Sequence, residues 1–161
     1  MAKIQMDVSE YEAMKENKAL LEKSLESERV LQEQIKQLTS EKIKAKATKV
    51  FNAYIRERDK GKPCVSCGSY NTAHASHFYS GGHYSGLKFN EDNVHSACVR
   101  CNTFLHGNLN EYRIRLIKRI GLERVEKLDL LAAQYKRQGY KWNRFYLQEV
   151  IDTYKQKIKE P

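Results

Sequence analysis

Paired cysteines at the spacing of metal ligands are the clearest chemical signal in this chain. Two C-x-x-C pairs, Cys64–Cys67 and Cys98–Cys101, are separated by thirty residues, and the chain has no other cysteine. Each pair can form a tight turn that directs two thiolates at one ion, and two such turns complete a tetrahedral site. We predict structural zinc bound by all four cysteines, with an iron–sulfur cluster or a redox-active dithiol as the alternatives. Such a site would tie together the ends of a segment too polar to fold by burial alone.

Histidines and asparagines surround these pairs, and four thiolates already complete the coordination of one zinc ion. His77 falls in a predicted β-hairpin ahead of Gly81 and Gly82. Asn93 precedes the second cysteine pair by five residues, and Asn102 directly follows it, where we expect a helix to begin. The five histidines of the chain are His74, His77, His83, His95 and His106.

The charge of the chain is concentrated in its cysteine-bearing part. Residues 1–45 carry 8 Lys/Arg against 9 Asp/Glu, whereas residues 46–161 carry 21 against 11. This distribution favours a polyanionic partner, with DNA or RNA as the leading candidate. Composition alone also allows a basic, soluble surface without a partner.

The elements that position these residues are predicted to be mostly helical. Residues 1–60 contain no Gly or Pro and are rich in helix-forming residues, and the 60–63 segment, Lys-Gly-Lys-Pro, should end this helix. Sixty helical residues would extend roughly 90 Å, so we expect a break. An interrupted 3-4 spacing of apolar residues predicts a weak coiled coil for dimerisation or docking, with a single solvated helix as the alternative. These apolar residues are Met14, Leu21, Leu31, Ile35 and Leu38.

Apolar residues at helical spacing continue beyond this coiled-coil region. We expect Phe51, Tyr54 and Ile55 to pack against the zinc module. Residues 109–161 should form three helices, separated at Gly121 and Gly139. The chain shows no apolar leader and no run of eighteen apolar residues. We therefore expect a cytoplasmic protein without a membrane span, located in the host cytosol if a phage encodes it.

At these motifs the sequence resembles the HNH, or ββα-metal, endonucleases. Within that superfamily it resembles the phage NinG (Rap) recombination nucleases, which are linked to cleavage of branched DNA and Holliday junctions. The four-cysteine site followed at once by Asn102 is also similar to the phage resolvase endonuclease VII. The resembling segments cover most of residues 50–125 and exclude the N-terminal helix. They are residues 50–59, 64–67, 76–78, 89–95, 98–102, 107–108, 112–113 and 120–121.

The resemblance implies a role for each residue by its position. His77 would be the general base that removes a proton from the water attacking the scissile phosphate, a task that suits an imidazole. Asn93 would hydrogen-bond across the loop and orient His77. Asn102 would bind a catalytic Mg²⁺ or Mn²⁺ ion through its side-chain oxygen, and this ion would stabilise the charge on the phosphate and the leaving 3′ oxygen.

One position departs from the HNH pattern. Many HNH sites carry Asp or His directly before the base as a second metal ligand, whereas this chain has Ser76. Alternate residues of a strand share a face, so His74 would point to the same side as Ser76 and is our candidate for the missing ligand. His95, His106 and Asn108 are further candidates at the site. For all of these residues a structural hydrogen bond or a helix cap is the alternative.

Together these features predict an α-rich α+β protein. A long helix or coiled coil would occupy residues 1–48, a zinc-stapled ββα-metal (HNH) core residues 49–125, and a C-terminal helical cap residues 126–161. The expected function is metal-dependent hydrolysis of DNA phosphodiester bonds, with branched recombination intermediates of the Holliday-junction or flap type as leading substrates. A homodimer held by the N-terminal helix would place two sites on opposed strands. The rivals are a non-catalytic zinc-stabilised nucleic-acid-binding module and a helix-mediated assembly protein.

Overall fold

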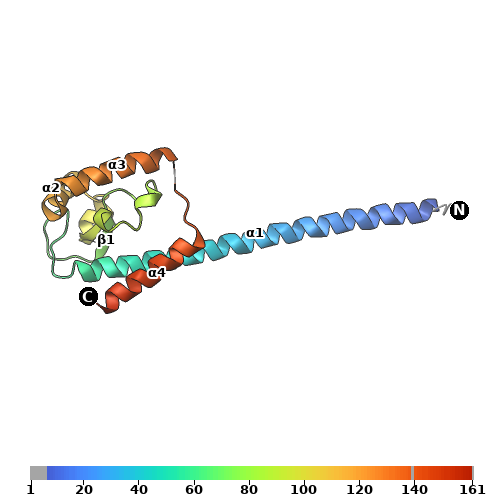
Figure 1. Ribbon diagram of the computed structural model, residues 1–161, viewed down its shortest axis with the longest axis horizontal. Helices are drawn as coiled ribbons and strands as arrows, with labels where there is room; N and C mark the ends of the chain where they lie inside the picture. The colour runs from blue at the N-terminus through green and yellow to red at the C-terminus, as the bar shows by residue number, and fades with distance from the viewer. Residues whose placement is uncertain (1–6, 139, 161) are drawn as a thin grey trace. The chain divides into compact units, whose positions relative to one another are not determined.

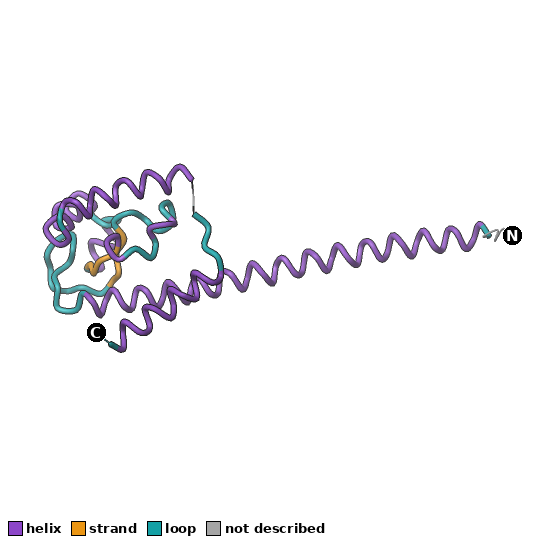
Figure 2. Tube along the Cα trace, in the orientation of Figure 1, coloured by secondary structure: helices purple, strands orange, loops and turns teal. Residues whose placement is uncertain are grey.

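The computed structural model describes residues 7–138 and 140–160, and among them it is rich in helix with one small sheet (Figure 1, Figure 2). This confirms the α-rich prediction. In order along the chain, the elements are α1 (Val8–Arg58), β1 (His74–His77), η1 (Ser85–Leu87), η2 (Glu91–Asn93), β2 (Val94–Ala97), η3 (Arg100–Phe104), α2 (Leu109–Ile120), α3 (Leu122–Gln138) and α4 (Arg144–Lys159).

The chain divides into two compact units, Met1–Lys42 and Ile43–Pro161. The predicted subdivision after residues 48 and 125 falls within α1 and α3 and stays a prediction. The break expected in the N-terminal helix was wrong: α1 is uninterrupted from Val8 to Arg58. The physical reason is the absence of Gly and Pro before Gly61, because these are the residues that most strongly stop a helix.

Apolar side chains of the first unit are open to solvent. The five that define the predicted coiled-coil seam are all more than half exposed, and the dimer expected from them stays a prediction. Their exposed fractions are 56% for Met14, 61% for Leu21, 56% for Leu31, 55% for Ile35 and 61% for Leu38. None of the described helices has the length and apolar character needed to cross a lipid bilayer.

Within the second unit, the end of α1 packs against α4 and the loop before β2 (Figure 1). Phe51 is fully buried and meets the ring of Phe89 edge-on at 5.6 Å and that of Tyr154 at 4.8 Å. Ile55 belongs to the same buried cluster, which also contains Val94. The predicted packing of this helix therefore involves the hairpin of the cysteine-bearing segment and α4, rather than the cysteines themselves.

A second buried cluster joins the cysteines to α2 and α3. Its largest fully buried members are Tyr112 and Leu116 of α2, Leu128 of α3 and Leu87 of η1. Gly121 separates the two helices, as predicted, with φ of 89° and ψ of 155°, a backbone conformation that is open essentially to glycine alone. The gap between α3 and α4 contains residue 139, which lies outside the described residues, and α4 begins at Arg144 with Asn143 as its N-cap.

The two strands pair antiparallel and contribute residues to both clusters. In this register His77 faces Val94, and His74 faces Ala97. Val94 belongs to the α1–α4 cluster, whereas Ala97 belongs to the cluster of the cysteines, α2 and α3. The sheet therefore connects both halves of the core, and alternation along β1 places His74 and His77 on opposite faces.

Candidate metal centre and histidine cleft

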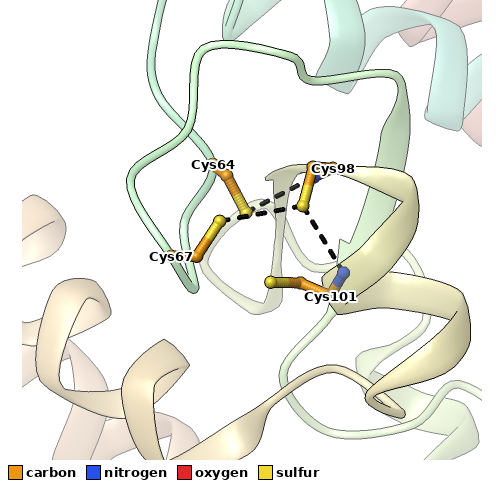
Figure 3. A group of neighbouring side chains, drawn as sticks. All are labelled: Cys64, Cys67, Cys98 and Cys101. Atoms are coloured by element: carbon orange, nitrogen blue, oxygen red, sulfur yellow. Dashed lines mark hydrogen bonds between the residues drawn. The ribbon is translucent and has the colours of Figure 1, made fainter.

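The four cysteines converge to form one cluster (Figure 3). All are free thiols, and their sulfur atoms lie within 4.8 Å of one another. The Sγ atoms of Cys67 and Cys98 are 3.7 Å apart. Tetrahedral zinc with Zn–S bonds of about 2.3 Å places its sulfurs roughly 3.8 Å apart, so the cluster fits the ion. Among the described residues, no other group of three or more His, Cys, Asp or Glu side chains is close enough to hold a metal.

Local backbone geometry explains why the sulfurs point inward. Gly68 closes the first turn by donating its N–H to the carbonyl of Cys64 at 2.9 Å, and its φ of 82° suits glycine. The N–H of Cys98 lies 3.3 Å from Sγ of Cys64, and that of Cys101 lies 3.4 Å from Sγ of Cys98 (Figure 3). Burial raises the pKa of the Cys64 thiol, but N–H groups directed at its sulfur outweigh this and lower the pKa to about 7. The cluster is thus a possible metal site consistent with structural zinc.

His77 is the last residue of β1, and its ring is fixed by one hydrogen bond. Its Nε2 lies 3.0 Å from the carbonyl oxygen of Lys88. A carbonyl only accepts, so Nε2 carries the proton and Nδ1 keeps a free lone pair. Within the described residues, Nδ1 has no hydrogen-bond partner. Burial lowers the pKa of His77 below its ordinary value, which favours the neutral ring.

The loop after β1 lies close against this ring. A Cβ at Gly81 would lie 3.4 Å from Nε2 of His77 and 3.1 Å from Cγ of Lys88, so glycine permits this approach. His77 also lines a cleft of about 440 Å³ that contains two other histidines and one arginine. Its lining residues are His77, Phe78, Tyr79, Ser80, His83, Tyr84, His106, Leu109, Asn110 and Arg113.

The side chain of Asn93 makes hydrogen bonds across the loop that follows β1, and residues of this loop line the cleft. Asn93 is fully buried, and its Oδ1 accepts the N–H of Tyr79 at 2.8 Å. Its Nδ2 donates to the carbonyls of Tyr79 at 2.9 Å and Leu87 at 3.0 Å. Its own carbonyl accepts the N–H of Phe78, the residue after His77. Asn93 therefore holds the two sides of the loop together, and it acts on the backbone next to His77 rather than on the imidazole.

His74 and Asn102 meet on the cysteine side of the sheet. Nδ2 of Asn102 lies 3.0 Å from Nδ1 of His74, and both side chains are partly buried. Neither residue is among the described residues that line the cleft. At about 3.3 Å per residue, His74 lies roughly 10 Å from His77 along the strand. The structure thus brings the two predicted ion ligands together, at a distance from the predicted base.

The remaining candidates have different environments. His95 is 3% exposed, and its ring nitrogens contact Nη2 of Arg58 at 3.0 Å and the carbonyl of Asp92 at 3.2 Å. His83 and His106 are exposed and line the cleft. Asn108 holds the N-cap position of α2 with φ of 47°, but its side chain makes no capping hydrogen bond. None of these arrangements tests a catalytic role.

The structure adds a group of three residues that the sequence did not single out: Tyr79 and Arg113, which line the cleft, and Asp129, which binds both of them. Arg113 of α2 forms two hydrogen bonds to the carboxylate of Asp129 in α3, at 3.0 and 2.7 Å. The hydroxyl of Tyr79 donates to the same carboxylate at 2.5 Å. Hydrogen bonds from Arg113 outweigh burial and lower the pKa of Asp129, so the group remains an ion pair. No spacing in the sequence relates these residues, because their contact joins three separate elements.

These observations define a class: a helix-rich protein with a four-cysteine centre next to a histidine-lined cleft. The model of the family described as Bacteriophage Lambda NinG protein matches residues 2–161. The chain belongs to the NinG family.

Relatives named Protein ninG occur in several phages. Those of Escherichia phage lambda and Salmonella phage P22 are 38% and 37% identical to this chain over 116 residues, which is 71% of the chain and 54% and 55% of the relatives. That of Enterobacteria phage H19B is 42% identical over 85 residues, covering 52% of this chain and 42% of its own. The chain thus spans about half the length of the curated relatives it matches. No solved structure matches it.

Proposed function

We propose that this protein is a metal-dependent endonuclease that hydrolyses phosphodiester bonds in DNA, with His77 as the general base. Branched recombination intermediates are the proposed substrates, and a homodimer is the proposed form on two-fold branched DNA. The proposal combines membership of the NinG family with the resemblance of the cysteine and histidine motifs to HNH endonucleases.

The state of the His77 ring is the observation that carries this proposal. The bond from Nε2 to the carbonyl of Lys88 orients the ring and leaves Nδ1 as an acceptor. The ring lines a cleft of about 440 Å³, which has room for water and a phosphate group. A general base needs a lone pair, a fixed direction and access to its proton donor. The free Nδ1 and the bond from Nε2 support the first two conditions, and the position of His77 in the cleft lining supports the third.

Charge at the cleft supports a phosphate-containing substrate. Arg113 lines it, and the carboxylate of Asp129 holds the planar guanidinium in one orientation. Residues 46–161 carry 21 Lys/Arg against 11 Asp/Glu, which favours binding of a polyanion. Arg113 would contact a phosphate oxygen while Nδ1 of His77 accepts the proton of the attacking water.

Asn102 and His74 are the proposed ligands of the catalytic Mg²⁺ or Mn²⁺ ion. When bound, a divalent ion would stabilise negative charge on the phosphate and the leaving oxygen. Their contact at 3.0 Å puts the two proposed ligands side by side, on the face of β1 opposite His77 and outside the cleft as the described residues line it. Asn102 also follows Cys101 directly, so a structural zinc ion would fix the backbone that positions it.

The test is a cleavage assay with His77→Ala on a four-way junction, a flap and a linear duplex in Mg²⁺ or Mn²⁺. We expect the variant to bind the junction as wild type does, while cleavage falls by roughly 10²–10⁴-fold, the typical contribution of a general base. His83→Ala is the comparison, because His83 lines the same cleft but has no assigned role. It should retain most of the activity.

The outcomes separate the rival functions. Wild-type protein that binds junctions but cuts no DNA in either metal would indicate a nucleic-acid-binding module. Weak, salt-insensitive DNA affinity would instead favour an assembly protein, because contacts to phosphates weaken steeply as salt rises. Equal cleavage by wild type and His77→Ala would remove His77 from the mechanism. His74→Ala and Asn102→Ala should each raise the metal concentration needed for half-maximal cleavage.

A further inference from the structure

An exposed aromatic side chain lies on the turn that leads from the cysteines to the cleft. Phe104, the last residue of η3, is 71% exposed. The next residue, Leu105, is 43% exposed, and Leu109 at the start of α2 is 47% exposed. Exposure of so much apolar surface on one short turn is unfavourable in water, and clustered surface of this kind often marks a site of interaction.

The backbone that carries Phe104 is held firmly. Gly107 donates its N–H to the carbonyl of Cys101 at 2.8 Å, and its own carbonyl accepts the buried hydroxyl of Ser66 at 2.8 Å. Leu105 donates to the carbonyl of Arg100 at 3.0 Å, which closes the wide turn of η3. The aromatic ring is therefore displayed on a turn that is anchored at both cysteine pairs.

The conformation after Phe104 is itself unusual. His106, Gly107 and Asn108 all have positive φ, at 48°, 95° and 47°. Such conformations are unfavourable for His and are retained when surrounding contacts enforce them, most often at functional sites. Wide turns of the η3 type are also found mainly at functional sites. These two features distinguish the Phe104 turn from an ordinary surface loop.

The same turn leads directly into the His77 cleft. His106 and Leu109, two and five residues after Phe104, both line it. Arg100, at the start of η3, is exposed on the other side of Phe104 in sequence. An exposed aromatic ring with a cation on the same turn, beside a phosphate-sized cleft, is the combination that single-stranded nucleic-acid sites use to stack bases.

We propose that Phe104, supported by Leu105, stacks on an unpaired or unstacked base of the DNA whose phosphate occupies the His77 cleft. This inference rests on the proposed function and specifies its substrate class. A continuous duplex must lose a few kcal/mol of stacking at the step that receives the ring, whereas a branch point or single-stranded gap has already lost it. The Phe104 turn therefore selects DNA with disrupted stacking over linear duplex.

The test measures binding separately from cleavage. In the His77→Ala background, Phe104→Ala is titrated with a four-way junction and with a linear duplex of matched sequence, each carrying 2-aminopurine as a fluorescent base. Stacking is worth about 1–3 kcal/mol per base, so junction affinity should fall roughly 5- to 150-fold. Duplex affinity should change less than about twofold. Phe104→Trp should restore the junction affinity and the 2-aminopurine response.

Phe145→Ala is the matched control, because Phe145 of α4 is 85% exposed and belongs to another element. It should bind both DNAs as its parent does, and circular dichroism checks that each variant keeps its helices. Equal junction affinity in the Phe104→Ala and Phe145→Ala variants would overturn the inference, as would equal losses on junction and duplex. A stacking defect without any nuclease activity in wild type would leave the inference standing and overturn the proposed hydrolysis.

Discussion

At the residue scale, two side chains of the segment from β1 to β2 have different tasks. His77 lines the cleft, and its Nε2 is bound to the carbonyl of Lys88. Asn93 reaches no cleft atom, yet it makes three side-chain hydrogen bonds to the backbone of Tyr79 and Leu87. The asparagine therefore positions the loop, and the loop positions the imidazole.

Replacement of Asn93 should destabilise the protein before it affects chemistry. Asn93→Ala removes three hydrogen bonds and leaves the N–H and the carbonyl of Tyr79 without these partners, whereas the carbonyl of Leu87 keeps the N–H of Asn90, so we expect the free energy of unfolding to fall by about 1–3 kcal/mol. Asn93→Asp should be at least as harmful, because it directs a carboxylate oxygen at two carbonyls. Urea unfolding of the purified variants measures both effects.

The matched control for this experiment is Asn110→Ala, because Asn110 is an exposed asparagine at the rim of the same cleft. It should change the stability by less than about 0.5 kcal/mol. An Asn93→Ala protein as stable as this control would show that the three hydrogen bonds contribute nothing net to folding.

At the element scale, one buried carboxylate joins the end of α1 to β2 and α2. Asp59 is 1% exposed, and its carboxylate accepts hydrogen bonds from Nε of Arg58 at 3.0 Å and from Nη2 of Arg58 at 2.9 Å. Burial would raise its pKa, but its hydrogen bonds to His95, Arg58 and the N–H of Ser96 outweigh this and hold the pKa far below the ordinary value. Lys62 and Arg119 lie 3.1 and 3.6 Å from the same carboxylate.

This network predicts a dependence of stability on acid. A carboxyl group whose pKa is lower in the folded state stabilises the protein at pH values above its unfolded pKa of about 3.9. That contribution is lost as the pH falls from about 4 towards the folded pKa. Asp59→Asn should lower the free energy of unfolding at pH 7 by about 3 kcal/mol, because it removes the charged partner of the largely buried guanidinium groups of Arg58 and Arg119. In this variant the free energy of unfolding should also depend less on pH below about pH 4, a region of the curve that we call its acid limb.

Glu57→Gln provides the control at the same end of α1. Glu57 pairs with Lys60 at 3.2 Å, but the two side chains are 49% and 76% exposed. Exposed pairs of this kind contribute less than about 1 kcal/mol, so this variant should keep the acid limb of wild type. An unchanged acid limb in Asp59→Asn would show that the network does not govern acid stability.

At the scale of the whole molecule, the four-cysteine centre should control the folding of residues 43–161. Its ligands come from the segment after α1 and from the segment after β2, so an ion at this centre would close a loop that includes the whole hairpin. We expect one zinc ion per chain by elemental analysis. A strong chelator should remove the ion and lower the thermal unfolding midpoint, because metal binding contributes directly to folding. Without chelator, the ion should be released in the same transition as thermal unfolding.

Cys67→Ser offers a milder perturbation than chelation. Cys67 is the exposed member of the four, so its replacement removes one ligand with little loss of packing. It should weaken zinc retention and lower the midpoint. A chain purified without zinc that unfolds at the wild-type temperature would contradict a structural role for the ion.

Several features of the fold and the site were predictable because they depend on local sequence. The helices, the stops at Gly61 and Gly121, and the convergence of the cysteines follow from spacing and from residues that interrupt helices. The continuity of α1 follows from the absence of Gly and Pro before Gly61, a stronger determinant than the length of the helix. The Asp59 network and the Arg113–Asp129 pair were not predictable, because their partners lie on different elements and share no periodicity.

The strand pair also constrains how this chain can change in length. Each strand has four residues, and the side chains alternate between the cluster around Val94 and the cluster around the cysteines. One residue inserted in β1 between His74 and His77 would disturb this alternation and place both histidines on the same face of the sheet. An insertion in the turn that follows Cys67, or in the glycine-rich loop, would leave the alternation intact. Length differences among NinG chains should therefore accumulate in those turns, while the four-residue strands and the direct junction of β2 with Cys98 stay as they are here.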